Sequence, residues 1–306
     1  MIVVGECINI IAGRVKAAIA SRDKSIIQDL ARRQAEKGAH FVEVNIGVSR
    51  KGGEELMAWM VEAIQEVVDI ALSLDTTNAT AMEAGLKLTK RKAIVNSTDA
   101  TQERLSQMVP LAARYGAGLI ALTLDEAGLP STVDARLELA MERLLPAAME
   151  QGIPLEDLYI DPMVLTVSGN QDQVPQAVEA VRLFKQMMDP PPRTICGLSN
   201  VSNGAPAENR PLINRVYLAM MLGAGVDAAI CNPLDDRLME VLRVIEERDE
   251  STPQGRLYLA LYDAYAAGEP FDATCVDASD LELRDIVKTI EMLENRSIYA
   301  HSYLRL

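Results

Sequence analysis

The chain has 306 residues, of which 49% are hydrophobic, enough to fill one large domain or two ordinary ones and to exclude global disorder. Its 30 Lys and Arg against 44 Asp and Glu leave a net charge of −14, which disfavours binding of nucleic acid. No apolar run approaches the roughly 20 residues that cross a bilayer, and the N-terminus lacks a basic export signal, so we expect a cytoplasmic protein that does not bind membranes.

Short apolar segments typical of strands alternate with amphipathic segments typical of helices from residue 2 to about residue 248. The expected strands are 2–8, 41–45, 70–75, 93–96, 118–123, 158–161, 194–199 and 226–231. The expected helices are 24–37, 54–68, 79–87, 101–115, 134–150, 174–188, 211–222 and 235–247. Eight strand–helix units predict an α/β protein with a (β/α)8 TIM barrel. An open doubly wound sheet is the alternative, disfavoured because no G-x-G-x-x-G follows the first strand.

Residues 1–248 are expected to form the barrel, and residues 249–306 a C-terminal helical extension. Within residues 249–279, which resemble an insertion, Leu257, Leu261 and Tyr265 share one helical face. Residues 280–306 predict one long amphipathic helix. We expect the extension to pack on the barrel or to form a dimer interface.

Polar side chains close almost every expected strand, and the C-terminal strand ends of such barrels carry the chemistry. These residues are Glu6, Asn9, Glu43, Asn45, Asp75, Asn96, Thr123, Asp125, Asp161, Ser199, Asn200 and Asn232. Each alone is more often a cap or turn residue. Together, carboxylates and carboxamides suit a flat heterocycle with several N–H donors, such as a pterin. A phosphate ligand would instead require a glycine-rich loop or a cluster of Lys and Arg.

The sequence resembles the methyltetrahydrofolate:corrinoid methyltransferase family, relatives of dihydropteroate synthase and of the folate module of cobalamin-dependent methionine synthase. The matching segments are VVGECIN (3–9), VEVNIG (42–47), LSLDTTN (72–78), IVNST (94–98), LYIDPMVL (158–165), GLSNVSNG (197–204), NRPLINRVYLAM (209–220) and GVDAAIC (225–231). The resemblance implies a pterin-binding barrel, a homodimer, and methyl transfer between tetrahydrofolate and the cobalt of a corrinoid that a partner protein carries.

The resemblance also implies roles for individual residues. Asp75, Asn96 and Asp161 would hold the pterin ring, and Asn200 would face the methyl-bearing nitrogen. Asn200 and Asp161 are thus the expected catalytic residues. Further expected lining residues are Gly197, Ser199, Asn203, Arg210 and Ile230. Position 43 departs from the family pattern, because Glu stands where Asp is expected.

Two other enzyme classes and a binder remain open. Cys7, Cys196 and Cys231 lie on strands one, seven and eight, which neighbour each other in a closed barrel, and could hold zinc for thiol methylation. Dispersed reduced cysteines are more often apolar filler, so we expect no metal. A dihydropteroate synthase would share the pterin site, with Arg210 and Arg215 as candidate pyrophosphate ligands. A folate-binding or scaffold protein without activity is the fourth interpretation.

Overall fold

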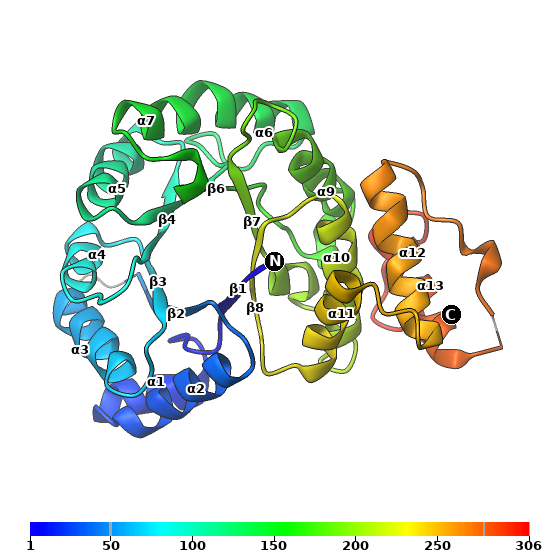
Figure 1. The fold of residues 1–306 in the computed structure, drawn as a ribbon, viewed down its shortest axis with the longest axis horizontal. Coiled ribbons are helices and arrows are strands. Elements are labelled where there is room, and N and C mark those ends of the chain that lie inside the picture. The colour runs from blue at the N-terminus through cyan, green and yellow to red at the C-terminus, as the bar shows by residue number, and fades with distance from the viewer. Residues whose placement is uncertain (49–50, 278, 306) are drawn as a thin grey trace.

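Eight parallel strands close into a barrel in the order β1 to β8, and this confirms the expected (β/α)8 fold (Figure 1). The computed structural model describes residues 1–48, 51–277 and 279–305. The strands are β1 Ile2–Gly5, β2 Phe41–Gly47, β3 Ala71–Thr76, β4 Ile94–Asp99, β5 Gly118–Leu122, β6 Leu158–Asp161, β7 Arg193–Gly197 and β8 Ala228–Cys231. All eight strand pairs are parallel, because each strand returns to the barrel through a helical crossover.

A ring of helices covers the outside of the barrel (Figure 1). The helices are α1 Gly13–Ser21, α2 Lys24–Glu36, α3 Gly53–Gln65, α4 Ala79–Leu86, α5 Gln102–Tyr115, α6 Val133–Leu139, α7 Leu145–Glu150, α8 Val167–Asn170, α9 Gln173–Phe184, α10 Arg210–Gly223 and α11 Asp236–Glu247. Helix α1 was not expected from the sequence, although Val15 and Ala18 bury one of its faces. Along the described part of the chain, no helix has both the length and the apolar character needed to span a membrane.

Alternate residues of each strand point into the barrel or toward the helices, as strand geometry requires. The interior of the barrel is filled by an apolar cluster whose buried members are Val4, Ile94, Ile120, Tyr159, Ile195 and Ala228. Two larger clusters fill the space between the strands and the helices. The apolar interior leaves polar inward positions only further along the strands, toward their C-terminal ends.

The segment expected as one helix over residues 134–150 follows one helical path with a π-helical interruption. Helix α6 passes into the π-helix η1 (Ala140–Leu144) and then into α7, where Pro146 occupies the first turn. Proline cannot donate a backbone hydrogen bond, and its ring would clash with the carbonyl group four residues earlier in a regular α-helix. The wider π-helical turn before Pro146 accommodates both effects.

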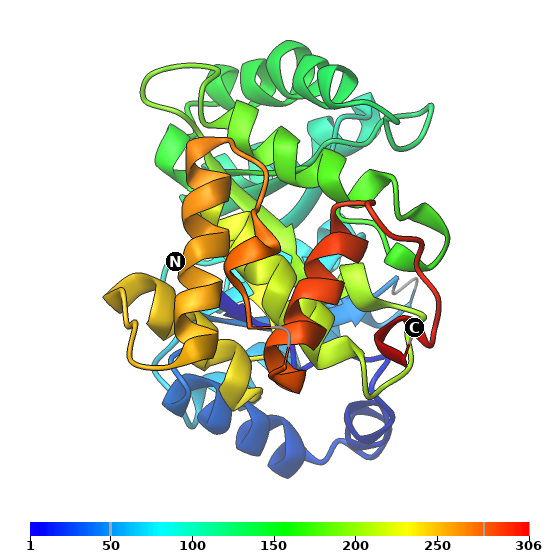
Figure 2. The same ribbon diagram turned by 90° about the vertical axis from the view of Figure 1, so that its right-hand side faces the viewer.

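The C-terminal extension consists of α12 (Pro253–Ala267) and α13 (Leu281–Leu293), which lie side by side on the outer surface (Figure 2). Both helices pack against α10. The expected helix over residues 280–306 was wrong beyond Leu293. There, Asn295 takes a positive φ of 60°, and Arg296 N donates a 2.8 Å hydrogen bond to Glu291 O, which together close a Schellman-type helix end.

Candidate functional site

Three polar side chains lie side by side at the C-terminal end of β2, β3 and β4. The strand register aligns Asn45 with Asp75 and Asp75 with Asn96, and Asn45 Nδ2 donates a hydrogen bond to Asp75 Oδ2. Burial raises the pKa of Asp75 to about 6, although the hydrogen bond from Asn45 and the charge of Arg104 oppose this rise. Asp75 therefore carries a negative charge at neutral pH and can accept hydrogen bonds from a ligand.

Glu43 lies two residues before Asn45 on β2 and points to the same side of the strand. Glu43 is 4% exposed, and its Oε1 accepts a 3.1 Å hydrogen bond from Asn96 Nδ2. Burial raises the pKa of Glu43 well above its ordinary value, and the nearby carboxyls of Asp75 and Glu6 raise it further. These groups form a cluster in which a proton is retained more tightly than in water.

Asp161 closes β6, further around the barrel, and is 6% exposed. Its Oδ1 accepts a 2.7 Å hydrogen bond from Met163 N. Burial raises the pKa of Asp161 to about 7, and the hydrogen bond from Met163 only partly offsets that rise. Asp161 can therefore exchange a proton near neutral pH, which is what a general acid or base requires.

The chain leaves β7 at Gly197 and turns into the 3-10 helix η3 (Leu198–Ser202), so the expected strand over residues 194–199 was wrong at its end. A Cβ atom on Gly197 would lie only 3.0 Å from Asn200 Nδ2, so glycine allows Asn200 to fold back over the strand end. The side chain of Asn200 is exposed. Ser199 Oγ donates a 2.6 Å hydrogen bond to Glu6 Oε1, which ties this turn to the segment after β1.

Asn203 and Arg210 extend this side of the site. Asn203 Nδ2 donates to Asn200 Oδ1 at 3.3 Å, and Arg210, the first residue of α10, donates from Nη2 to Asn203 Oδ1 at 3.0 Å. Burial raises the pKa of Glu6, and the hydrogen bond from Ser199 and the positive charge of Arg210 oppose that rise. Through these two hydrogen bonds, Arg210 of α10 orients the Asn203 side chain, which in turn orients the carboxamide of Asn200.

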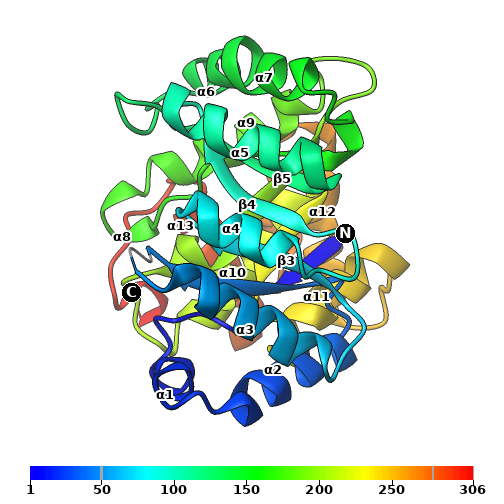
Figure 3. The same ribbon diagram turned by 90° about the vertical axis from the view of Figure 1, so that its left-hand side faces the viewer.

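The structure thus places the expected site residues in two groups around one end of the barrel. Asp75 and Asn96 lie on β3 and β4, and the residues from Gly197 to Arg210 begin with the last residue of β7 and continue into α10. Because β3 and β7 are four strands apart in a closed barrel of eight, they face each other across it. Asp161 on β6 lies between the two groups, and the inward-facing Ile230 lies on β8, next to β7. Figure 3 shows the loops of this end, with α1 and α8, opposite the N-terminus.

Two carboxyls lie closer to the site than the sequence patterns indicated, and one cation was missed. Glu6 and Glu43 were expected at strand ends but not among the binding residues. Each approaches another member of the site, Ser199 and Asn96 respectively. Arg104 is absent from the expected site residues, because its contacts join the loop after β3 to β4 and no sequence motif indicates them. The alternation of Phe41, Glu43 and Asn45 on β2 is the signal that could have placed Glu43 inside the barrel.

The cysteines do not point to a metal centre. Cys196 and Cys231 are buried in the cluster between strands and helices, and Cys7 Sγ donates to Asn232 Oδ1 at 3.1 Å. Burial raises the pKa of the Cys7 thiol to about 12. Within residues 1–48, 51–277 and 279–305, no three His, Cys, Asp or Glu side chains are grouped so as to hold a metal ion.

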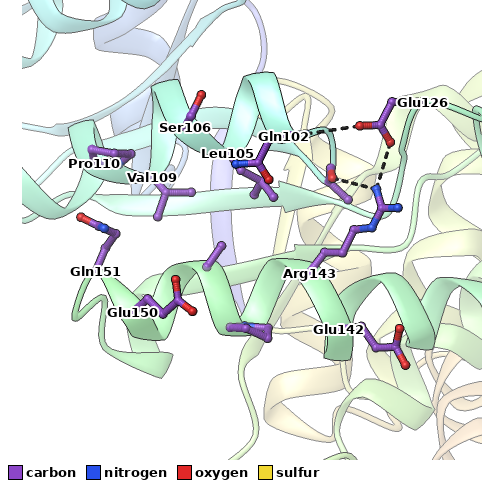
Figure 4. Close-up of a pocket in the computed structure, with 13 residues that line it drawn as sticks. Gln102, Leu105, Ser106, Val109, Pro110, Glu126, Glu142, Arg143, Glu150 and Gln151 are labelled. Atoms are coloured by element: carbon purple, nitrogen blue, oxygen red, sulfur yellow. Dashed lines mark hydrogen bonds and ion pairs between the residues drawn. The ribbon is translucent and has the colours of Figure 1, made fainter.

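A separate cavity of about 500 Å³ lies outside the barrel, between α5 and the η1–α7 segment (Figure 4). Arg143 crosses one end of it and donates to Ala100 O at 3.2 Å and to Glu126 Oε2 at 2.9 Å. Glu126 also accepts a 3.3 Å hydrogen bond from Gln102 N. These contacts fix the start of α5 from its outer side.

The closed barrel gathers carboxyl and carboxamide groups at the C-terminal end of its strands, where barrels of this class carry their sites. The pterin binding enzyme family matches residues 11–232, and the chain belongs to this family. The expected family is thereby confirmed, and the chain is an enzyme by that membership.

Several known proteins are similar to the chain. A methylcorrinoid:tetrahydrofolate methyltransferase from Eubacterium limosum is 30% identical over 241 residues, which cover 78% of this chain and 88% of that protein. A methionine synthase from Mycobacterium leprae (strain TN) is 26% identical over 82% of this chain, which spans only 21% of that larger protein. A dihydropteroate synthase structure from Thermus thermophilus has a TM-score of 0.58 at 19% identity, covering 81% of this chain and 93% of that one. This last likeness supports the fold alone.

Proposed function

We propose that the protein is a methyltransferase that moves a methyl group between methyltetrahydrofolate and the cobalt of a corrinoid carried by a partner protein. The observation that carries the proposal is a 30% identity to a protein named for this chemistry, over a match that covers 88% of that protein. The array of Asp75, Asn96 and Asp161 at one end of the barrel supports it, because the oxygens of these side chains can accept hydrogen bonds from the N–H groups of a pterin. The corrinoid is a substrate here, and we propose no metal held by this chain.

In this proposal, Asp75, Asn96 and Asp161 hold the pterin ring. The charged Asp75 accepts from ring N–H and amino groups, and the Asn96 carboxamide accepts through its oxygen, because its amino group donates to Glu43. Gly197, Ser199, Asn203, Arg210 and Ile230 line the opposite side. Binding across the barrel orients the methyl-bearing nitrogen toward the open end, where a protein-bound cobalt can approach.

Asn200 assists at the methyl-bearing nitrogen. In the forward transfer the carbon–nitrogen bond breaks, its electron pair stays on nitrogen, and reduced cobalt supplies the pair for the new bond to carbon. The nitrogen must accept a proton before or while this bond breaks, because expulsion of an amide anion is prohibitively costly. Asn200 can hydrogen-bond this nitrogen in either protonation state, while Asp161, whose pKa is raised to about 7, can supply a proton.

Two measurements test the proposal together. Calorimetric titration with 5-methyltetrahydrofolate is expected to show one site, and a corrinoid assay with reduced cobalamin is expected to show loss of the Co(I) absorbance. Absence of binding would refute the pterin site. Tight binding without turnover against any corrinoid would indicate a folate-binding protein. Formation of dihydropteroate from a pterin pyrophosphate and aminobenzoate would indicate a synthase instead.

We further propose a homodimer, following the resemblance of the sequence to its family. Solution scattering at micromolar concentration is expected to give about twice the chain mass of 33.4 kDa. A mass of one chain would refute the dimer and leave the methyltransferase proposal unchanged.

A further inference from the structure

One arginine outside the barrel contacts the backbone next to two of the expected pterin-binding residues. Arg104 of α5 donates from Nη1 to Thr77 O at 2.7 Å and from Nη2 to Ser97 O. Thr77 lies two residues after Asp75, and Ser97 directly follows Asn96. A single planar guanidinium therefore joins the loop that follows β3 to the C-terminal half of β4.

The positive charge of Arg104 is also placed to act on the site. Its hydrogen bonds to Thr77 and Ser97 go to carbonyl oxygens, which do not neutralise it. The carboxylates that interact electrostatically with Arg104 are those of Asp99, Glu103 and Asp75. Asp99 Oδ1 already accepts from Thr101 N at 2.9 Å. Asp75 is thus the member of this set that belongs to the site.

Other groups around Asp75 do not replace this charge. From β2, Asn45 supplies a neutral hydrogen bond, and Glu43 is another acid. Helix α4 packs on β3 and carries Glu83, which is engaged by Arg114 at 3.1 Å. Among the described residues, Arg104 is the cation whose charge opposes protonation of the Asp75 carboxyl.

We propose that Arg104 is a positioning residue of the pterin site, which holds the backbone next to Asp75 and Asn96 and keeps the Asp75 carboxylate negatively charged. This inference rests on the proposed function, because it assigns Asp75 to the pterin ring. Lysine could supply the charge but not the two parallel donors of a guanidinium. Glutamine could supply one donor but no charge.

The test uses the full chain with the variants Arg104→Gln and Arg104→Lys, and Arg114→Gln as a matched control on the same helix. Arg114 is 62% exposed and its ion pair lies on the surface. The start of α5 is independently fixed by Arg143 and Glu126 (Figure 4), so the Arg104 variants are expected to fold. Circular dichroism and a melting curve check this for each variant.

The first readout is the pH dependence of 5-methyltetrahydrofolate affinity. In the wild type and in Arg114→Gln, affinity rises as the pH increases through about 6, where Asp75 loses its proton. In Arg104→Gln, the midpoint moves upward by about one pH unit. In Arg104→Lys, the midpoint stays and affinity falls by a similar factor at every pH. Equal midpoints in Arg104→Gln and the wild type would overturn the charge role, and unchanged affinity in Arg104→Lys would overturn the backbone role.

The second readout needs no folate and separates this inference from the proposed function. Infrared titration of the free protein follows the carbonyl band of protonated Asp75, identified by its absence in Asp75→Asn. A higher titration midpoint in Arg104→Gln than in the wild type supports the inference even if methyltetrahydrofolate fails to bind, which would refute the proposed function alone. Coincident titrations overturn the charge role of Arg104 even if the protein binds folate tightly.

Discussion

Asn96 Nδ2 lies 3.1 Å from Glu43 Oε1, and both side chains are almost fully buried inside the barrel. This bond fixes the orientation of the Asn96 carboxamide, because its amino group faces Glu43 and its carbonyl oxygen faces away. Glu43, which lies deeper in the barrel, thereby determines that the carbonyl oxygen of Asn96 is the group available to a ligand. The rise in the pKa of Glu43 favours the neutral carboxyl, which can accept this bond without burying a charge.

Replacement of Glu43 by glutamine tests this interpretation. A neutral Glu43 resembles glutamine in shape, and the carbonyl oxygen of glutamine can accept from Asn96. We expect Glu43→Gln to keep the melting temperature of the wild type. Its methyltetrahydrofolate affinity should stay within about threefold of the wild-type affinity. Glu43→Ala, which leaves the Asn96 amino group without its acceptor, is expected to lose about 1–3 kcal/mol of stability. A large loss of affinity in Glu43→Gln would show that a charge at position 43 is needed.

Asp161 is expected to lower stability as the pH rises. Its folded-state pKa of about 7 lies above the ordinary 3.8, so the folded state binds the proton more tightly than the unfolded state. The stabilisation is complete below about pH 4 and is lost as the pH rises to about 7. Asp161→Asn lacks this titration. The unfolding free energy of Asp161→Asn minus that of the wild type should therefore increase by a few kcal/mol from pH 4 to 8, since each pKa unit is worth about 1.4 kcal/mol.

Urea unfolding at several pH values measures this gain. Asp249→Asn is the control, because the Asp249 pKa is lowered to about 2 and the group does not titrate in that range. A difference between Asp161→Asn and the wild type that stays constant with pH would contradict a raised pKa at Asp161.

Asn200 and Asp75 are expected to fail in different ways when truncated. Asn200→Ala should lower the methyl-transfer rate by about 10²-fold, while methyltetrahydrofolate affinity falls much less, because its hydrogen bond strengthens as the nitrogen gains charge. Asp75→Ala should chiefly abolish binding. Single-turnover kinetics with calorimetry separate the two effects. Equal losses of rate and affinity in Asn200→Ala would argue against its role in the transition state.

The barrel could be predicted because local patterns and global architecture agree over most of the chain. The eight apolar strands each precede an amphipathic helix, and polar residues recur at the strand ends. That pattern alone predicts Asp75, Asn96 and Asp161 at one end of the barrel. Their assignment to a pterin remains a prediction, since it comes from the resemblance of the sequence to its family.

The remaining features depend on contacts between distant segments. Strand β1 ends at Gly5, earlier than expected, because Cys7 N turns to the side chain of Gln34, where it donates a 3.0 Å hydrogen bond to Oε1. Helix α13 ends at Leu293 although its apolar periodicity continues to Ile298, which is 89% exposed. The contacts of Arg104 likewise join segments that are 27 and 7 residues away in sequence. Periodicity carries no information about such pairs.

Gly223 is expected to decide how closely the C-terminal extension packs on the barrel. A Cβ atom there would lie 2.5 Å from Tyr265 Cβ and 2.6 Å from Tyr262 O, both in α12, and a backbone oxygen cannot move aside as a flexible side chain can. Gly223→Ala should therefore force α10 and α12 apart and cost about 1–3 kcal/mol of stability. Gly13→Ala is the matched control, because nothing lies within 4 Å of its added methyl group, and alanine is the better helix former. Urea midpoints followed by far-ultraviolet circular dichroism compare the two variants. A Gly223→Ala protein as stable as the Gly13→Ala protein would mean that α12 does not pack on α10 at this distance.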